Sequence, residues 1–204
     1  MNKYSNEGVF SINQDREGSL WIGSNLTGLR RLKDGKFERL SIEEGLSDKF
    51  VSAIVEDREG SLWIGTDNGG LNRLKDTELT RYTTKDGLSN DDVTCVSEDL
   101  EANLWIGTTN LLNRSKGGKF FTYGREDGLK DPLVKSVYAD REGNAWIGTN
   151  GGLYLYKDGK FTLFTAKDGL AHNFVRALHE DRQGSLWIIQ GGKIHNLHHP
   201  RWIV

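Results

Sequence analysis

Apolar and polar residues recur along the chain with a period of about 42 residues. The stretch "DREGSLWIGT", which begins at Asp57, returns as "DREGSLWIGS", "DLEANLWIGT", "DREGNAWIGT" and "DRQGSLWIIQ". The tryptophans of the five copies are separated by 42, 42, 41 and 41 residues; they are Trp21, Trp63, Trp105, Trp146 and Trp187. A nearly constant spacing of this length indicates a repeat architecture.

Within each repeat, short apolar runs alternate with turn residues, and this pattern predicts four strands. Twelve residues before each tryptophan stands a valine, and nine before it an aliphatic residue, as at Val51 and Ile54. An Asp-x-x-Gly turn follows, with Ala102 in place of the glycine once, and then Leu-Trp-Ile or a close variant. Apolar residues at successive positions predict a strand that is covered on both faces. A third strand is expected at "GLNRL" from Gly70, and a fourth is centred on Phe37, Leu79, Phe120, Phe161 and Trp202 in the successive repeats.

Four short antiparallel strands repeated at this period are typical of β-propeller blades. The fold class is therefore all-β, a propeller of four-stranded antiparallel blades with five blades in this chain. A single domain over 1–204 is expected, with repeats at roughly 8–45, 50–87, 92–128, 133–169 and 174–204. A row of small residues ten before each tryptophan fits the crowded inner strands of a propeller; it consists of Ser11, Ala53, Cys95, Ser136 and Ala177.

The repeated stretch is interpreted as scaffold. The aspartate and glycine shape the hairpin turn, the tryptophan fills the space between blades, and the glycine two residues later permits close approach of a neighbouring blade. The first and last repeats keep Trp-Ile, so they are not polar caps. Either the five blades close into a ring, which is the favoured interpretation, or the terminal blades associate with another chain.

At "EDREGSLWIGTDNGGLNRL" followed by "YTTKDGLSNDDV", the sequence resembles the two-component regulator propeller repeat. The resemblance implies a sensor propeller of bacterial signalling proteins, which lies in the periplasm or outside the cell. Such a propeller binds a ligand, in some bacteria an oligosaccharide, and passes a signal to a histidine kinase or cyclase. The chain shows no kinase and no linking β-sandwich, so signal output by this chain alone is not expected.

Ligand contacts are expected at positions that vary between repeats, because the repeated positions are scaffold. The inter-blade loops and the turns between second and third strands should share one face of the propeller. Lys135 and Arg176 occupy the most variable position of the inner strands and are hypothesised to bind an anionic or hydroxyl-rich ligand. The remaining predicted ligand-binding residues are polar groups of the loops and turns, namely Asn68, Asn110, Asn150, Asp91, Asp92 and His172.

Composition adds mainly exclusions. A net charge of -2 with interspersed charges provides no basic stripe for nucleic acid, and no apolar run is long enough for membrane insertion. The single cysteine cannot form an internal disulfide. Neither "SNDDV" nor "HNLHHP" has the ligand set of a known metal site, so no metal and no cofactor is expected.

Enzyme signatures such as a nucleophile elbow or a phosphate-binding loop are missing, and the sequence favours a non-catalytic protein. One alternative is a propeller lyase of the streptogramin-lyase type, since such enzymes use scattered His and Glu residues. His179, with Tyr138 at the equivalent position one blade earlier, would then be of interest. A further alternative is a structural or protein-binding propeller without a small-molecule ligand.

Overall fold

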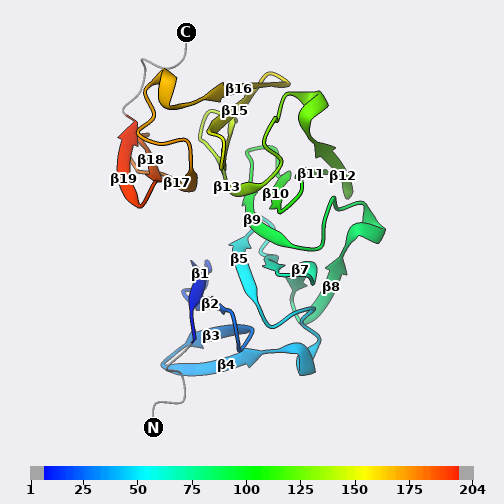
Figure 1. Cartoon of the computed structure of the whole chain (residues 1–204). Coiled ribbons are helices and arrows are strands. Elements are labelled where there is room, and N and C mark those ends of the chain that lie inside the picture. The colour runs from blue at the N-terminus through cyan, green and yellow to red at the C-terminus, as the bar shows by residue number, and fades with distance from the viewer. Residues whose placement is uncertain (1–6, 198–204) are drawn as a thin grey trace. The chain divides into compact units, whose positions relative to one another are not determined.

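The computed structural model describes residues 7–197 and contains five antiparallel sheets that form β-propeller blades (Figure 1). Each sheet keeps its strands in chain order, so every blade is a meander of hairpins. Blades 1 and 2 consist of β1 (Val9–Gln14), β2 (Leu20–Ser24), β3 (Leu29–Lys33), β4 (Lys36–Leu40), β5 (Val51–Glu56), β6 (Leu62–Thr66), β7 (Gly70–Lys75) and β8 (Glu78–Tyr82). The predicted all-β propeller fold is confirmed.

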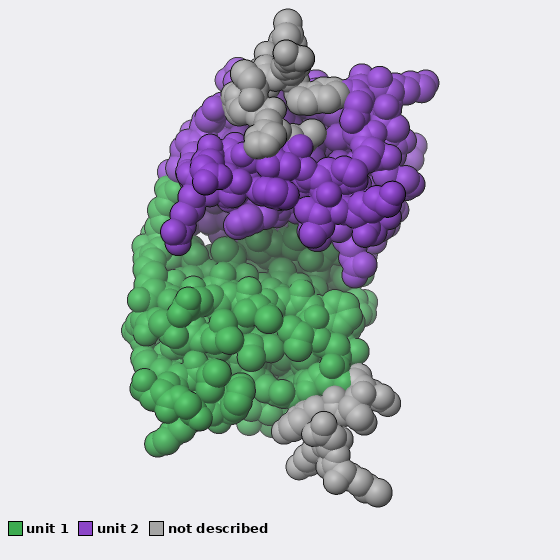
Figure 2. All heavy atoms as spheres, turned by 90° about the vertical axis from the view of Figure 1, so that its left-hand side faces the viewer, with its two compact units in different colours: residues 1–96 green, residues 97–204 purple. Residues whose placement is uncertain are grey.

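Blades 3 and 4 repeat this plan, and blade 5 has three strands among the described residues. The strands are β9 (Val93–Glu98), β10 (Leu104–Thr108), β11 (Leu112–Lys116), β12 (Lys119–Tyr123), β13 (Val134–Ala139), β14 (Ala145–Thr149), β15 (Leu153–Lys157), β16 (Lys160–Phe164), β17 (Val175–Glu180), β18 (Leu186–Gln190) and β19 (Lys193–Leu197). The strand expected around Trp202 lies outside the described residues. Two compact units divide the chain at Val96, inside β9, and are coloured separately in Figure 2.

The Asp-x-x-Gly turn is built as the sequence predicts, and it also holds the tryptophan. Asp57 Oδ1 accepts from the backbone N–H groups of Glu59 and Ser61, while Gly60 has a φ of +80°. The other carboxylate oxygen accepts from the indole Nε1 of Trp63 at 2.7 Å. The same indole-to-aspartate bond occurs in the other four blades. The aspartate therefore fixes the tryptophan rotamer as well as the turn.

Adjacent blades pack where a glycine faces a valine. A Cβ atom added to Gly23 would lie 2.5 Å from Val51 Cγ1, and one added to Gly65 would lie 2.6 Å from Val93 Cγ1. Ala53 pairs with Gly65 across the sheet, and this added Cβ would come within 3.3 Å of the alanine Cβ. The row of small residues thus serves the same close approach as the glycines.

A 3-10 helix precedes every inner strand from blade 2 onward, and it brings a leucine into the gap between blades. These helices are η1 (Ile42–Glu44), η2 (Thr84–Asp86), η3 (Arg125–Asp127) and η4 (Ala166–Asp168). Each ends at a left-handed glycine, such as Gly45 with a φ of +101°, and the next residue is a buried leucine. Leu46 lies with Leu29 and Val51 in the core between blades 1 and 2. The "GL" of the loop motif is therefore a packing element.

At the opposite end of the blades, an arginine after the turn aspartate clamps the next blade. Arg16 donates from Nη1 and Nη2 to the backbone oxygens of Arg58 and Asp57, both at 2.7 Å. Its backbone N–H donates to the Glu56 carboxylate at 2.9 Å. In the second unit, Arg141 makes the same three contacts with Glu180 and with the turn of blade 5. Leu100 occupies the arginine position in blade 3.

Among residues 7–197, no helix has the length and apolar character needed to cross a lipid bilayer.

Candidate functional site

The inner strands carry a β-bulge at the position that the sequence marks as most variable. In blade 2, Val51 pairs with Thr66 and Ala53 pairs with Gly65, so Ser52 is an extra residue. The same register shift makes Phe10, Lys135 and Arg176 the extra residues of blades 1, 4 and 5. A bulge changes the direction of a side chain without ending the strand. The variable residues therefore stand on a rigid strand, but their side chains need not follow the alternating directions of a regular strand.

Lys135 and Arg176 stand on neighbouring inner strands of the second unit. Strands β13 and β17 lie against each other, and the valine before each cation is fully buried. Lys135 is half-buried and Arg176 is exposed. Neither side chain forms a hydrogen bond or an ion pair with any residue that the structure describes. Two unpartnered cations on adjacent rigid strands can receive an anion or several hydroxyl groups.

The inter-blade loops and the second hairpin turns share one end of the blades, as predicted; we call this end the loop face. Ser47 of the first loop contacts Thr66 of the blade 2 sheet through their hydroxyls at 3.0 Å. Asp67 donates its backbone N–H to Phe50 O at 3.1 Å. In blade 5, His172 donates its backbone N–H to Gln190 Oε1 at 2.9 Å. These contacts tie the loops before blades 2 and 5 to the sheet ends and turns beside them.

His172 replaces the aspartate or asparagine that caps this loop in other blades. Asp48 Oδ1 accepts from the Phe50 N–H, and in blade 5 His172 Nδ1 accepts from the Phe174 N–H at 2.9 Å. The proton of a neutral His172 ring is thereby placed on Nε2. The ring lies over Gly191, where an added Cβ would be 3.2 Å from its Cγ. His172 itself is exposed.

Gln190 is a feature of this region that the sequence analysis missed. Blades 1 to 4 have serine or threonine at this position, whose hydroxyl bonds to the adjacent turn, as Thr66 does to Gly70 O at 2.8 Å. Gln190 is 2% exposed, and its Nε2 has no hydrogen-bond partner among residues 7–197. The replacement of serine or threonine by glutamine at this repeat position could have marked Gln190 in the sequence.

The asparagines predicted for the site all lie in exposed turns. Asn68 adopts a left-handed conformation with a φ of +61°, which asparagine tolerates well. Asn110 donates its backbone N–H to Thr108 Oγ1 at 3.2 Å, and Asn150 is exposed in the corresponding turn of blade 4. Asn68 belongs to the first unit, whereas Asn110 and Asn150 belong to the second with Lys135 and Arg176.

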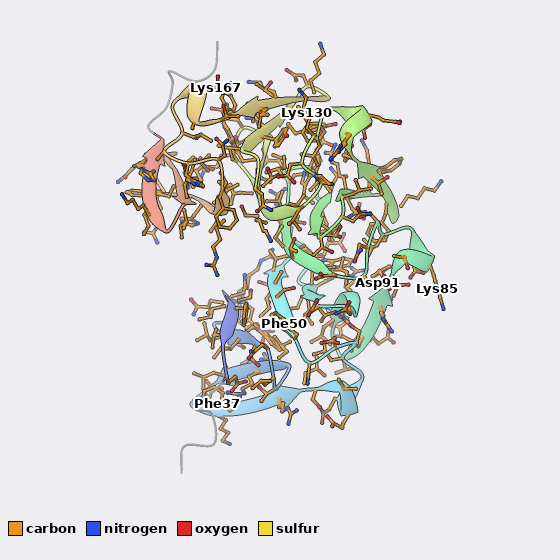
Figure 3. The ribbon with its side chains drawn as sticks, in the orientation of Figure 1. Phe37, Phe50, Lys85, Asp91, Lys130 and Lys167 are labelled. Carbon is orange, nitrogen blue, oxygen red and sulfur yellow. The ribbon has the colours of Figure 1, made fainter. Side chains whose placement is uncertain are left out.

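Asp91 and Asp92 differ in their surroundings although they are adjacent. Asp91 Oδ1 accepts from the Thr84 N–H at 2.6 Å, so this carboxylate anchors its own loop between β8 and β9 (Figure 3). Asp92 instead shares a hydrogen bond with Asp67. Burial, the Asp92 carboxyl and, more weakly, Asp48 raise the pKa of Asp67. The first unit thus presents carboxylates at its loop face, together with the mutually tilted rings of Phe10 and Phe50, whose centroids are 4.6 Å apart.

We expect Asp67→Asn to stabilise the protein by a few tenths to about 1 kcal/mol at pH 7, because like charges in contact oppose folding. A carboxyl whose pKa is raised by folding destabilises when ionised, and this penalty disappears as the pH falls through the folded-state pKa. The advantage of the variant should therefore shrink in acid. Urea unfolding at neutral pH and at about pH 4 tests this. The matched control, Asp91→Asn, should destabilise, because its carboxylate accepts a backbone N–H. A destabilised Asp67→Asn variant would contradict the account.

His179, the residue behind the lyase alternative, lies near the turn end of the inner strand. Its ring meets Tyr138 edge-on with centroids 6.1 Å apart. Burial and the nearby Glu180 raise the pKa of Tyr138. Within the described part of the chain, no group of three His, Cys, Asp or Glu side chains could hold a metal ion. His198 and His199 of "HNLHHP" lie outside the described residues.

Comparison with known proteins bears on the scaffold. Four segments, residues 3–26, 45–68, 128–151 and 169–189, match the model of the family described as two component regulator propeller. These four segments are similar to two-component regulator propeller repeats. Each matched segment covers an inner strand, the Asp turn and the Trp strand, or most of them. The third repeat of this chain, with Leu100 and Ala102 in place of arginine and glycine, lies outside the matched segments.

Solved structures that carry the same fold include extracellular domains of hybrid two-component systems. The extracellular domain of BT3049 from B. thetaiotaomicron, assigned as a hybrid two-component system, is 21% identical with a TM-score of 0.82; the match covers 92% of this chain and 27% of that one. The corresponding domain of BT4673 from the same organism is 21% identical with a TM-score of 0.80, over 97% of this chain and 30% of that one. The propeller-repeat chain thus spans less than a third of these relatives.

An enzyme is also similar in fold. Virginiamycin B lyase from Staphylococcus aureus, in a catalytically inactive form with quinupristin, is 17% identical with a TM-score of 0.76; the match covers 93% of this chain and 66% of that one. At these identities the likeness shows the fold alone. Among curated protein sequences, none matches the propeller-repeat chain.

Proposed function

We propose that this chain is a non-catalytic ligand-recognition module of a bacterial two-component-type sensor. The observation that carries the proposal is the pair of unpartnered cations, Lys135 and Arg176, held at bulges on adjacent inner strands. The residues that define the repeat are engaged in turns and blade packing, so they are not available for a ligand. The bulge residues differ from blade to blade, as selective recognition requires.

The ligand class that fits is an oligosaccharide, preferably one with carboxylate or sulfate groups. Lysine and arginine donate to both hydroxyls and anionic oxygens, and charge-assisted hydrogen bonds of this kind are the strong ones. Asn150 and His172 of the same unit would add further hydrogen-bonding groups around them. Similarity to extracellular sensor domains supports a periplasmic or extracellular location.

The proposal predicts that a panel of neutral and anionic oligosaccharides contains a binder detectable by thermal shift and calorimetry. Changing both cations, Lys135→Glu and Arg176→Glu, should weaken that binding at least about ten-fold, since each charged hydrogen bond is worth roughly 1.5–3 kcal/mol. The matched control reverses two exposed lysines of the outer strands, Lys119 and Lys160, and should leave affinity unchanged.

Equal affinity of the double variant and the parent would refute the role of the two cations. Quinupristin belongs in the same panel, because the lyase of similar fold was crystallised with it. Its conversion to product by this chain would favour the enzyme alternative, and loss of that activity in a His179→Ala variant would locate it. Binding of a protein alone, with no small molecule, would favour the structural alternative.

A further inference from the structure

The loops before blades 2 to 5 share one backbone cap, and the loop before blade 5 builds it with a different chemistry. In each loop, a side chain three residues before the buried valine accepts from the backbone N–H two residues after itself. The acceptors and donors are Asp48 and Phe50, Asn90 and Asp92, Asp131 and Leu133, and His172 and Phe174, at 2.7, 2.7, 3.2 and 2.9 Å. Three of these caps use an Asp or Asn oxygen, which is usual in such turns. Only the cap of blade 5 uses a nitrogen that can itself take up a proton.

The His172 cap exists only while the imidazole is neutral. In the neutral ring, the Nδ1 lone pair accepts from the Phe174 N–H and the proton is on Nε2. A protonated imidazole carries an N–H on both nitrogens, so Nδ1–H would point at the Phe174 N–H. Two donors cannot bond to each other, and the protonated ring therefore has to leave the capping position. Histidine is the side chain that ordinarily gains this proton between about pH 5 and 8.

The surroundings provide no acidic partner that would keep a protonated His172 in place. The titratable and charged residues on η4, β17 and β19, which surround this loop, are Lys167, Asp168, Arg176, His179, Glu180, Lys193 and His195. The Asp168 carboxylate accepts from Thr165 just before η4, and the Glu180 carboxylate accepts from the Arg141 N–H at the far end of β17. Within residues 7–197, His172 forms no ion pair. A protonated ring is thus free to turn outward.

The rest of the loop is anchored by contacts that do not involve the ring. The backbone N–H of His172 donates to Gln190 Oε1 at 2.9 Å. Asn173 Oδ1 accepts from the Ala166 N–H at 2.7 Å, and Gly191 donates its N–H to Phe174 O at 3.4 Å. Release of the ring therefore changes the His172 side chain and the Phe174 N–H while the loop stays attached to η4 and to blade 5.

We propose that His172 is an acid-operated switch on the loop face of the second unit. At neutral pH the imidazole caps the Phe174 N–H, and in mild acid the ring leaves as a cation with two free N–H donors. Lys135 and Arg176 are the second residues of β13 and β17, at the ends that follow the loops, so the released ring adds a third positive charge to this end. Tighter binding of an anionic ligand in mild acid is a consequence that rests on the proposed function, whereas the switch itself does not.

The test uses nuclear magnetic resonance on the ¹⁵N-labelled full chain without any ligand, so its outcome is independent of the proposed ligand site. At pH 8 and pH 5, the ring nitrogens of His172 report their protonation. The scalar coupling between His172 Nδ1 and the Phe174 amide nitrogen reports the hydrogen bond directly. The Asp92 amide, which Asn90 caps, is the internal control. The matched variant, His172→Asn, copies the Asn90 cap into blade 5.

At pH 8 we expect the proton on Nε2 and a measurable coupling to the Phe174 nitrogen. At pH 5 we expect a doubly protonated ring, loss of the coupling and a shift of the Phe174 amide resonance, with the Asp92 amide unchanged. In His172→Asn, the Phe174 amide should keep its capped position at both pH values. A proton on Nδ1 at pH 8, a ring still neutral at pH 5, or an equal shift of Phe174 in the variant overturns the proposal. If His172→Asn does not fold, His172→Asp, which copies Asp48 and Asp131, takes its place.

Discussion

Replacement of Trp105 by alanine is expected to lower the free energy of unfolding by about 4–5 kcal/mol, the upper range for large aromatic core residues. Trp105 is 2% exposed, and its ring lies 5.0 Å from Tyr156 of the next blade and 5.7 Å from Tyr123 of its own. The Arg114 guanidinium lies 4.9 Å above it. Truncation would remove these contacts and the indole donor to Asp99. Urea unfolding followed by circular dichroism measures the loss.

Trp187→Ala is the matched control for this prediction. Trp187 occupies the same position in blade 5 and also donates to its turn aspartate, at 2.8 Å, but it is 39% exposed. The expected loss is about 1–2 kcal/mol, because less apolar area leaves water when it folds. Equal losses for the two variants would show that blade packing is not what the tryptophan contributes.

Gly148→Ala is expected to destabilise the chain by about 2–3 kcal/mol through overpacking. The added Cβ would lie 2.4 Å from Ser136 Oγ, 2.7 Å from Val175 Cγ1 and 2.9 Å from the Val175 carbonyl oxygen. The carbonyl belongs to the inner strand of the next blade, so relief requires the two blades to separate. The transition should also broaden if blade 5 unfolds separately. Differential scanning calorimetry of the parent protein and the Gly148→Ala variant measures this loss of stability.

Gly18→Ala separates this packing effect from backbone strain. Gly18 has a φ of +83° but no atom within 4 Å of an added Cβ. Only the cost of a left-handed alanine remains there, roughly 1–2 kcal/mol. Should Gly148→Ala cost no more than Gly18→Ala, the close approach of the blades would not depend on the glycine.

The distribution of chemistry follows from the repeat. Positions that recur are occupied by turn, core and clamp contacts, while the bulge and the loop face vary between blades. In the first unit these positions bring together aromatic rings and carboxylates, and in the second unit lysine, arginine and histidine. A screen that uses only neutral sugars would therefore leave the charge character of both units unused.

The strands and turns of a blade could be predicted from the sequence alone. Its period, the Asp-x-x-Gly turns and the valine, tryptophan and glycine rows predict the strands, because each depends on residues only a few positions apart. The sequence pattern could also have predicted the β-bulge of the inner strand. Val51 and Ile54 are three residues apart yet share one face, which a regular strand with a period of two does not allow.

Contacts between segments that lie far apart in the sequence could be seen only in the three-dimensional structure. The clamp of Arg16 on the blade 2 turn, the carboxyl pair of Asp67 and Asp92, and the hydrogen bond that Gln190 Oε1 accepts from the His172 N–H each join segments that the local pattern treats separately. Val9 is exposed and Val51 is buried, although the sequences around these two valines are alike. Local pattern specifies a blade, and the neighbour that covers it decides whether its apolar face is core or surface.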